Sequence, residues 1–229
     1  MQKIMFDDRY DLTNLVLSGR KTQTRRLEKT LQRVPQDRQI FRLDQYGYDT
    51  VDERKYCEIK MGAPIVGETW YEIKPYIHMW EEVAIAMRYH DVMENRFMNL
   101  PKDEINTWYK KLGDAIETKP ETHMGWGNKQ SVRPDFMPGR IYIDNIRVQH
   151  IQDISEEDCL AEGIQVDLNI GKGLPTYFFK DVVKNKEYHY NTSKEAFKAL
   201  IEREGGSKAW ENNGLVIVYD FHLVPRKKF

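Results

Sequence analysis

Residues Gly139–Ile164 read GRIYIDNIRVQHIQDISEEDCLAEGI, and this stretch joins a strand pattern directly to a helix pattern. In its first half, Ile141 and Ile143 alternate with polar residues, whereas the next apolar residue, Ile146, falls in the opposite phase. Because side chains on a strand point alternately to its two faces, this change of phase predicts a strand interrupted by a bulge or tight turn at Asp144-Asn145.

The second half of the stretch carries the start and stop signals of a short helix. Ser155, with Asp158 three residues later, resembles a capping box at a helix N-terminus. Gly163 is a typical stop signal. We therefore predict a short helix that ends at Glu162.

The clearest strand pattern in the chain is GLVIVYDFHLV, Gly214–Val224. Its first half is apolar on both faces, which predicts a buried, central strand. A helix with a capping box at its start is predicted over Thr192–Arg203. Near the N-terminus, apolar residues at helical spacing predict a short helix over residues 9–18 that ends at Gly19.

The remaining segments have weaker signals. We predict a polar, turn-rich excursion over 30–60, a strand over Thr69–Ile73, helices over 78–98 and 101–117, and a connection containing Gly and aromatic residues over 165–190.

Strands mixed with short helices, without regular alternation, predict an α+β fold and a small closed or half-closed β-barrel. We expect one domain over residues 1–229, with a mainly helical insertion at 76–130. The insertion is rich in Met, which packs well in cores but is also common on surfaces that bind a protein partner. Both interpretations stay open.

The overall charge excludes one class of nucleic-acid-binding protein. The chain has 35 basic and 36 acidic residues, whereas a protein that coats long duplexes is usually strongly basic. A local site for a nucleotide or a short single strand is still compatible with this balance. The two cysteines, Cys57 and Cys159, lack a partner at ligand spacing, so neither a disulfide scaffold nor a metal site is expected. We predict a cytoplasmic protein without a membrane span.

No cofactor is expected either. The sequence has no phosphate-binding P-loop, dinucleotide fingerprint, nucleophile elbow or helical His pair. NIGKGLP, Asn169–Pro175, favours a turn over a phosphate cradle.

The octet GRKTQTRR, Gly19–Arg26, directly follows the first predicted helix. If it is extended, Thr22 and Thr24 share one face, whereas a local bend could bring Lys21 close to Thr24. A Thr hydroxyl becomes a nucleophile when a neighbouring group accepts its proton, and a buried Lys can be that group.

The basic residues of the octet have their own candidate role. The guanidinium groups of Arg20, Arg25 and Arg26 are suited to contacts with phosphate or carboxylate. The alternative is a solvated basic loop without a ligand.

The order of these motifs resembles the ASCH domain, a PUA-like β-barrel family. The resemblance rests on GRKTQTRR, on VGETWYE, on the run from Val132 to Ile164, and on the apolar C-terminal strand. It covers roughly residues 1–30, 62–75, 131–165 and 193–224, and it is closest to the larger, phage- and prophage-associated members.

The resemblance implies a barrel of five or six strands with a cleft for RNA or a nucleobase. Small bacterial ASCH proteins include amidohydrolases that deacetylate acetylcytidine, and their catalytic Lys, Thr and Glu fall on Lys21, Thr24 and Glu162. Other members are reported as ribonucleases or assumed to bind RNA. Arg140 stands where a phosphate-contacting Arg is expected.

Three functions therefore stay open. The first is a module that binds RNA or a modified nucleoside in a cleft lined by Lys21, Thr24 and Glu162. Its nucleic-acid contacts would come from Arg20, Thr22, Arg25, Arg26 and Arg140. The second is an enzyme at the same cleft, an amidohydrolase or a ribonuclease. The third is a phage-derived protein whose 76–130 insertion binds a protein partner.

Overall fold

The computed structural model describes residues 1–27, 77–168, 174–226 and 228, and four short strands between residues 41 and 61. Those strands form two antiparallel pairs: β3 (Phe41–Arg42) with β6 (Lys60–Met61), and β4 (Tyr46–Tyr48) with β5 (Lys55–Cys57). The strand predicted over Thr69–Ile73 and the glycines of NIGKGLP lie outside the described residues.

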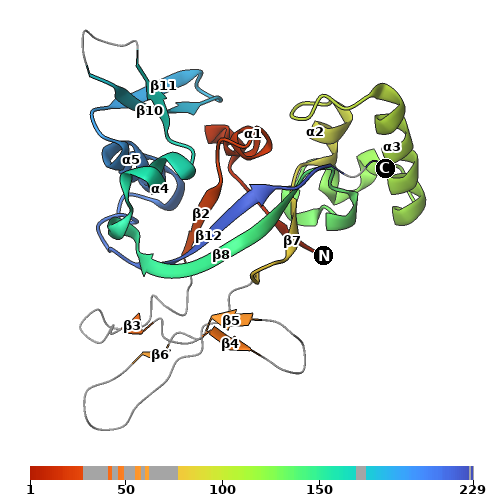
Figure 1. Ribbon diagram of the computed structural model, residues 1–229. Helices are drawn as coiled ribbons and strands as arrows, with labels where there is room; N and C mark the ends of the chain where they lie inside the picture. Colours follow the sequence, from red (N-terminus) through yellow and green to blue (C-terminus); the bar gives the residue numbers. More distant parts are fainter. Residues whose placement is uncertain are drawn as a thin grey trace.

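A mixed sheet of five strands forms the centre of the fold (Figure 1). In spatial order its strands are β1 (Gln2–Ile4), β7 (Glu82–Ile85), β8 (Arg140–His150), β12 (Leu215–Leu223) and β2 (Gln23–Leu27). β1 and β7 are parallel, and the other neighbours are antiparallel. The α+β class is therefore confirmed. In the parts of the chain that are described, β1 and β2 are open edges, and no pairing closes the sheet into a barrel.

The two long strands, β8 and β12, behave as the sequence predicts. β12 lies between β8 and β2, and its residues from Leu215 to Tyr219 are buried. The register shifts next to Asp220, which pairs with Asn145, whereas the following residue pairs with Ile143. Asp144 is therefore the extra residue of a bulge, at the predicted position.

Three predicted helices are also confirmed. They are α1 (Leu12–Leu17), α4 (Glu156–Ala161) and α5 (Ser193–Gly205). A 3-10 turn, η1 (Asp8–Tyr10), precedes α1. The hydroxyls of Ser155 and Thr192 accept backbone N–H groups at the starts of α4 and α5, which satisfies donors that a helix N-terminus leaves free.

The helix predicted over 78–98 is wrong for its first half. Residues Val83, Ala84 and Ile85 form most of β7, are fully buried and lie between β1 and β8. Pairing on both sides outweighs the local helical pattern, because burial within a sheet rewards a continuous apolar run. The range assigned to a helical insertion, 76–130, thus contains a strand of the central sheet.

The rest of this range contains two α-helices, and the second of them agrees with the helix predicted over 101–117. α2 (Tyr89–Met93) and α3 (Lys102–Ile116) pack around the fully buried Trp108 in a second, smaller core. Short 3-10 turns follow: η4 (Pro120–Thr122), η5 (Met124–Trp126), η6 (Lys129–Ser131) and η7 (Pro134–Phe136), and later η8 (Ile151–Asp153). Figure 1 shows α2 and α3 at one end of the long strands and α4 and α5 near the other.

The connection predicted over 165–190 is instead mostly a small antiparallel sheet, β9 (Gln165–Asp167), β10 (Thr176–Asp181) and β11 (Lys186–Tyr190). Its main anchor is Phe179, which is 1% exposed and stacks on Tyr188 at 5.3 Å between ring centroids. The guanidinium of Arg203 lies over the Tyr188 ring. Aromatic packing against α5 therefore stabilises strands in a segment whose apolar and polar residues alternate only weakly. Within the described ranges, no helix has the length and apolar character needed to cross a membrane.

Candidate functional site

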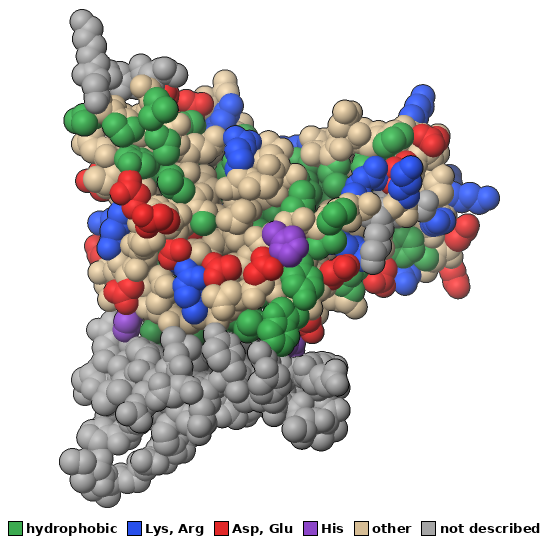
Figure 2. Space-filling view, viewed as in Figure 1, with side chains coloured by type: hydrophobic (Ala, Val, Ile, Leu, Met, Phe, Trp, Pro, Cys, Tyr) green, Lys and Arg blue, Asp and Glu red, His purple; other side chains and the backbone are tan. Residues whose placement is uncertain are grey.

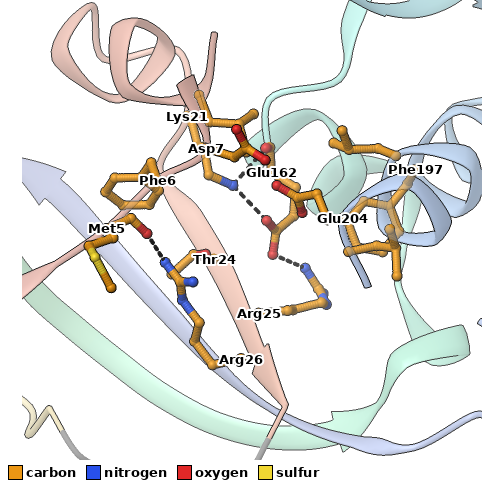
Figure 3. Close-up of a pocket in the computed structure, with 13 residues that line it drawn as sticks. Met5, Phe6, Asp7, Lys21, Thr24, Arg25, Arg26, Glu162, Phe197 and Glu204 are labelled. Carbon is orange, nitrogen blue, oxygen red and sulfur yellow. Dashed lines mark hydrogen bonds and ion pairs between the residues drawn. The ribbon is translucent and has the colours of Figure 1, made fainter. Parts of the chain in front are cut away.

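A cavity of about 210 Å³ lies where β2, the end of α4 and the last turns of α5 meet the N-terminal segment Met5–Asp7 (Figure 3). The three residues predicted as catalytic, Lys21, Thr24 and Glu162, all line it. At roughly 30 Å³ per water molecule, the space corresponds to about seven waters. It is smaller than the roughly 300–1,000 Å³ of pockets for drug-sized ligands, and it suits one small ring or acyl group.

A tight turn after α1 places Lys21 at the cavity. Gly19 adopts a φ of +72°, which reverses the chain, and the amides of Arg20 and Lys21 both donate to the carbonyl of Leu15. The next residue, Thr22, donates its amide to Ala161 and accepts the amide of Phe221 through its carbonyl. These bonds fix the turn between α4 and β12, so the Lys21 side chain enters the interior.

Lys21 and Glu162 form a buried ion pair. The Nζ atom of Lys21 donates to Oε2 of Glu162 at 2.6 Å and to its backbone carbonyl at 2.7 Å. The side chains are only 2% and 6% exposed. Since an ammonium group has three N–H donors, one is left without a partner among the residues described. Burial lowers the pKa of Lys21, against the opposing effect of the Glu162 charge.

Glu162 is held in place by the way α4 ends. It is the C-terminal cap of α4, and Gly163 follows with a φ of +103°. A Cβ atom on Gly163 would lie 3.1 Å from Leu15 Cδ1 and 3.6 Å from Lys21 Cδ. Glycine thus allows both the left-handed backbone and the close approach of the Leu15 side chain, whereas the contact with Lys21 would be an ordinary one.

A second cation holds the other oxygen of Glu162. Arg25 donates to Glu162 Oε1 at 2.9 Å and to Asp158 Oδ2 at 2.6 Å, and its side chain is 1% exposed. Asp158 also pairs with Arg147 at 2.9 Å and accepts a bond from Gln23. Arg25 lines the cavity, but its guanidinium is engaged by these carboxylates, so its present role is to orient Glu162.

The Thr24 hydroxyl is different from its neighbours. Thr24 lines the cavity and is 5% exposed, yet its hydroxyl makes no side-chain hydrogen bond to any residue that the structure describes. It is therefore free to bind or to react with a molecule in the cavity. Lys21 and Thr24 line the same cavity, although no hydrogen bond joins their side chains in this structure.

The other predicted contacts divide into two groups. Arg26 lines the cavity, where its guanidinium donates to the Met5 carbonyl and lies 5.8 Å from the centre of the Phe6 ring. Arg20, Thr22 and Arg140 do not line it. Arg20 bonds Ser18 and Gln165, and Arg140 pairs with Glu82 at 3.3 Å. On the face in Figure 2, basic and acidic side chains are interspersed, and the described residues form no continuous basic track.

Two walls of the cavity are formed by residues that the sequence analysis does not predict as part of a site. One is the segment Met5–Asp7, which carries no motif. The other is the face of α5 formed by Phe197, Ile201 and Glu204. Their spacing of four and then three residues marks one face of a helix, a signal that could have linked Glu204 to Phe197 and Ile201.

The cavity thus brings together a fixed amine, a fixed carboxylate and a hydroxyl that has no side-chain hydrogen bond among the described residues, and acyl-transfer sites are built from groups of these kinds. Among the residues described, no cluster of His, Cys, Asp and Glu is arranged to hold a metal ion. No protein-family model, curated protein or solved structure matches the chain, so the similarity to the ASCH domain rests on the sequence motifs alone.

Proposed function

We propose that this protein hydrolyses the amide of a small N-acylated nucleobase or nucleoside in the Lys21–Glu162 cavity. The observation that carries the proposal is the unpartnered Thr24 hydroxyl in the same small cavity as the buried Lys21–Glu162 pair, within the part of the chain that is described. The class of reaction, hydrolysis of an acyl compound, follows from this set of groups. The nucleobase follows from the resemblance to the ASCH family, in which the central sheet would be part of a PUA-like barrel.

In this proposal Thr24 is the nucleophile and Lys21 accepts its proton. Burial lowers the pKa of Lys21, which increases the fraction of neutral amine that can act as a base. Glu162 orients the amine, because it binds two of the hydrogen-bonding positions of Nζ and leaves the third for the cavity. Arg25 in turn keeps Glu162 from rotating.

The rest of the cavity suits a planar, polar substrate. Phe6 and Phe197 are among its lining residues and offer apolar surface to a ring. Arg26 brings a positive charge to the same space, where it would stabilise the oxyanion that forms when Thr24 attacks a carbonyl. The cavity is too small for several nucleotides, so a single base fits it better than an RNA strand does.

A second candidate is a module that binds a nucleoside without hydrolysing it. The distance of 2.6 Å between Nζ and Oε2 favours this candidate, because a charged ammonium paired with a carboxylate is a donor and not a base. The two candidates differ in whether bound acetylcytidine is turned over.

The test is acetate release from acetylcytidine by the full-length chain. We expect Lys21→Met, Thr24→Val and Glu162→Gln each to reduce turnover at least about 100-fold, the usual size of the loss when a nucleophile or base is removed. Thr22→Val is the matched control, since Thr22 is exposed, lies two residues away and does not line the cavity. Equal turnover by wild type and Thr24→Val would contradict the proposal. Binding without turnover would favour the second candidate.

A further inference from the structure

Glu204 is a further carboxyl group at the cavity, and the predicted catalytic set does not include it. It lies on the last turn of α5, one residue before the helix ends, and it lines the cavity with Lys21 and Glu162. Figure 3 shows its side chain reaching from α5 toward these two residues. The residue as a whole is exposed, whereas its side chain reaches into the cavity, where the surrounding atoms remove the carboxyl group from much of the water.

The Glu204 carboxyl makes no hydrogen bond or ion pair with any residue that the structure describes. Its position is also electrostatically unfavourable. The C-terminal end of a helix carries a partial negative charge, which repels a carboxylate. Among the described residues no hydrogen bond or ion pair therefore holds this carboxyl group, which leaves it available to a molecule in the cavity.

The charges that face Glu204 come from every element around the cavity. Lys21, in the turn before β2, and Arg26, in β2, favour its ionised form, and Asp7 and Glu162 oppose it. Removal of the carboxyl group from water has the largest effect, and together these influences raise the pKa of Glu204 to about 7. Near neutral pH, Glu204 can thus exist in both the protonated and the ionised form.

We propose that Glu204 donates a proton to the nitrogen that leaves when the amide is cleaved. This inference rests on the proposed function. The Thr24 oxygen forms a bond to the acyl carbon, and the Thr24 proton passes to neutral Lys21. The C–N bond then breaks, and the nitrogen keeps its electron pair and takes the proton of Glu204. The products of this half-reaction are a free amine and an acyl ester on Thr24.

Water completes the cycle. A water molecule attacks the ester carbon and gives one proton to the Glu204 carboxylate, while the Thr24 oxygen recovers its proton from Lys21. The net reaction consumes one amide and one water and yields one carboxylic acid and one amine. Each protein group returns to its starting form, so no further reactant is needed.

The inference also defines the substrate class. An acid at the leaving group is needed for an amide, whose nitrogen leaves poorly without a proton, but not for an aryl ester, whose oxide is already a good leaving group. Glu204 therefore contributes to the cleavage of amides and contributes little to the cleavage of activated esters of the same acyl group. This difference depends on the leaving group and not on the acyl group.

The experiment compares acetylcytidine with p-nitrophenyl acetate in wild type and Glu204→Gln. We expect the variant to lose at least about 100-fold in amide turnover, the lower end of the contribution of general acids. The first-turnover release of nitrophenolate should stay within about threefold, because that step needs no acid. The loss of activity above neutral pH, which reports ionisation of the acid, should disappear from the kcat/KM profile of the variant.

Glu202→Gln is the matched control, because it makes the same change two residues earlier on α5, outside the cavity. Equal losses on amide and ester in Glu204→Gln would overturn the inference, since they would mean a general effect on the site. If wild type cleaves the amide and Glu204→Gln does so equally well, only the role of Glu204 fails. If wild type cleaves neither substrate, the proposed function fails and the role of Glu204 with it.

Discussion

Nζ of Lys21 lies 2.6 Å from Oε2 of Glu162, although the two residues are 141 positions apart in the sequence. Each of the two oxygens of Glu162 has its own cation, since Arg25 binds the other one. The pair joins the turn after α1 to the end of α4, and so it contributes both to folding and to the chemistry of the cavity. The most informative tests are variants that change either the stability of the fold or the chemistry of the cavity, but not both to the same extent.

Lys21→Met should destabilise the fold and abolish turnover. The variant keeps the apolar part of the side chain but leaves Glu162 Oε2 and the Glu162 carbonyl without a donor. Breaking a buried pair costs about 3–5 kcal/mol, and because Arg25 still neutralises Glu162 we expect about 3 kcal/mol. Urea unfolding and acetate release measure the two effects.

Arg88→Met is the matched control for Lys21→Met. The buried Asp91 also has two cations, Arg88 at 2.7 Å and Arg96 at 3.3 Å, and all three lie away from the cavity. Removing Arg88 should cost about 2 kcal/mol, as for a hydrogen bond to a charged group, and should leave turnover intact. If both variants lost turnover in proportion to stability, the Lys21 effect would be structural only.

Thr24→Val should separate chemistry from stability. The Thr24 hydroxyl has no side-chain hydrogen bond in the described structure, and Val keeps the shape and the β-branch that a strand favours. We therefore expect a free energy of unfolding within about 0.5 kcal/mol of wild type, together with loss of turnover. A stability loss of several kcal/mol would show that the hydroxyl has a structural partner, and would argue against its role as the nucleophile.

The parts of the site with local signals could be predicted. Gly19 and Gly163 mark where α1 and α4 end, and each end leaves a charged residue, Lys21 or Glu162, at the turn. Neither the periodicity nor the spacing of the sequence predicts that these two turns meet. Only the resemblance to the ASCH family indicated this contact. The phase change at Asp144 predicted the bulge because a bulge shifts the alternation within a single strand.

The parts that depend on distant contacts could not be predicted. Residues 82–85 have a helix-like context, and they become a strand because β1 and β8 pair with both of their edges. β9 to β11 form a sheet through aromatic packing of Phe179 and Tyr188 against α5. Glu204 follows the predicted end of its helix at Arg203, so its place at the cavity depends on two more residues of α5.

Gly163→Ala should destabilise the protein more than Gly19→Ala does. Both glycines have a positive φ, which costs roughly 1–3 kcal/mol for a residue with a Cβ atom. At Gly163 the new methyl group would also lie 3.1 Å from Leu15 Cδ1, whereas at Gly19 nothing lies within 4 Å. The difference between the two variants in the free energy of unfolding, measured with urea, therefore gives the cost of the contact with Leu15 alone.

The same pair of variants also tests the geometry of the site. Because the backbone strain and the tight contact with Leu15 arise directly next to Glu162, we expect Gly163→Ala to lower turnover as well as stability. Similar free energies of unfolding for the two variants would mean that the end of α4 has room to move, and that Glu162 is less firmly positioned than the contacts indicate.

Glu204→Gln should stabilise the protein at alkaline pH and not at acidic pH. The pKa of Glu204 is raised from its ordinary 4.5 to about 7 in the folded protein, so between these values the folded form binds more protons than the unfolded form. Stability from this group is therefore present at low pH and is lost as the pH rises through about 7. Gln carries no charge at any pH and avoids this loss. The difference in Tm between the variant and wild type should grow from about pH 5 to about pH 8.

Glu202→Gln is the control that corrects for the change in net charge. A difference that stays constant over this interval would mean that the Glu204 carboxyl titrates alike in the folded and unfolded chain, and Glu204 would then hold no proton to donate near neutral pH.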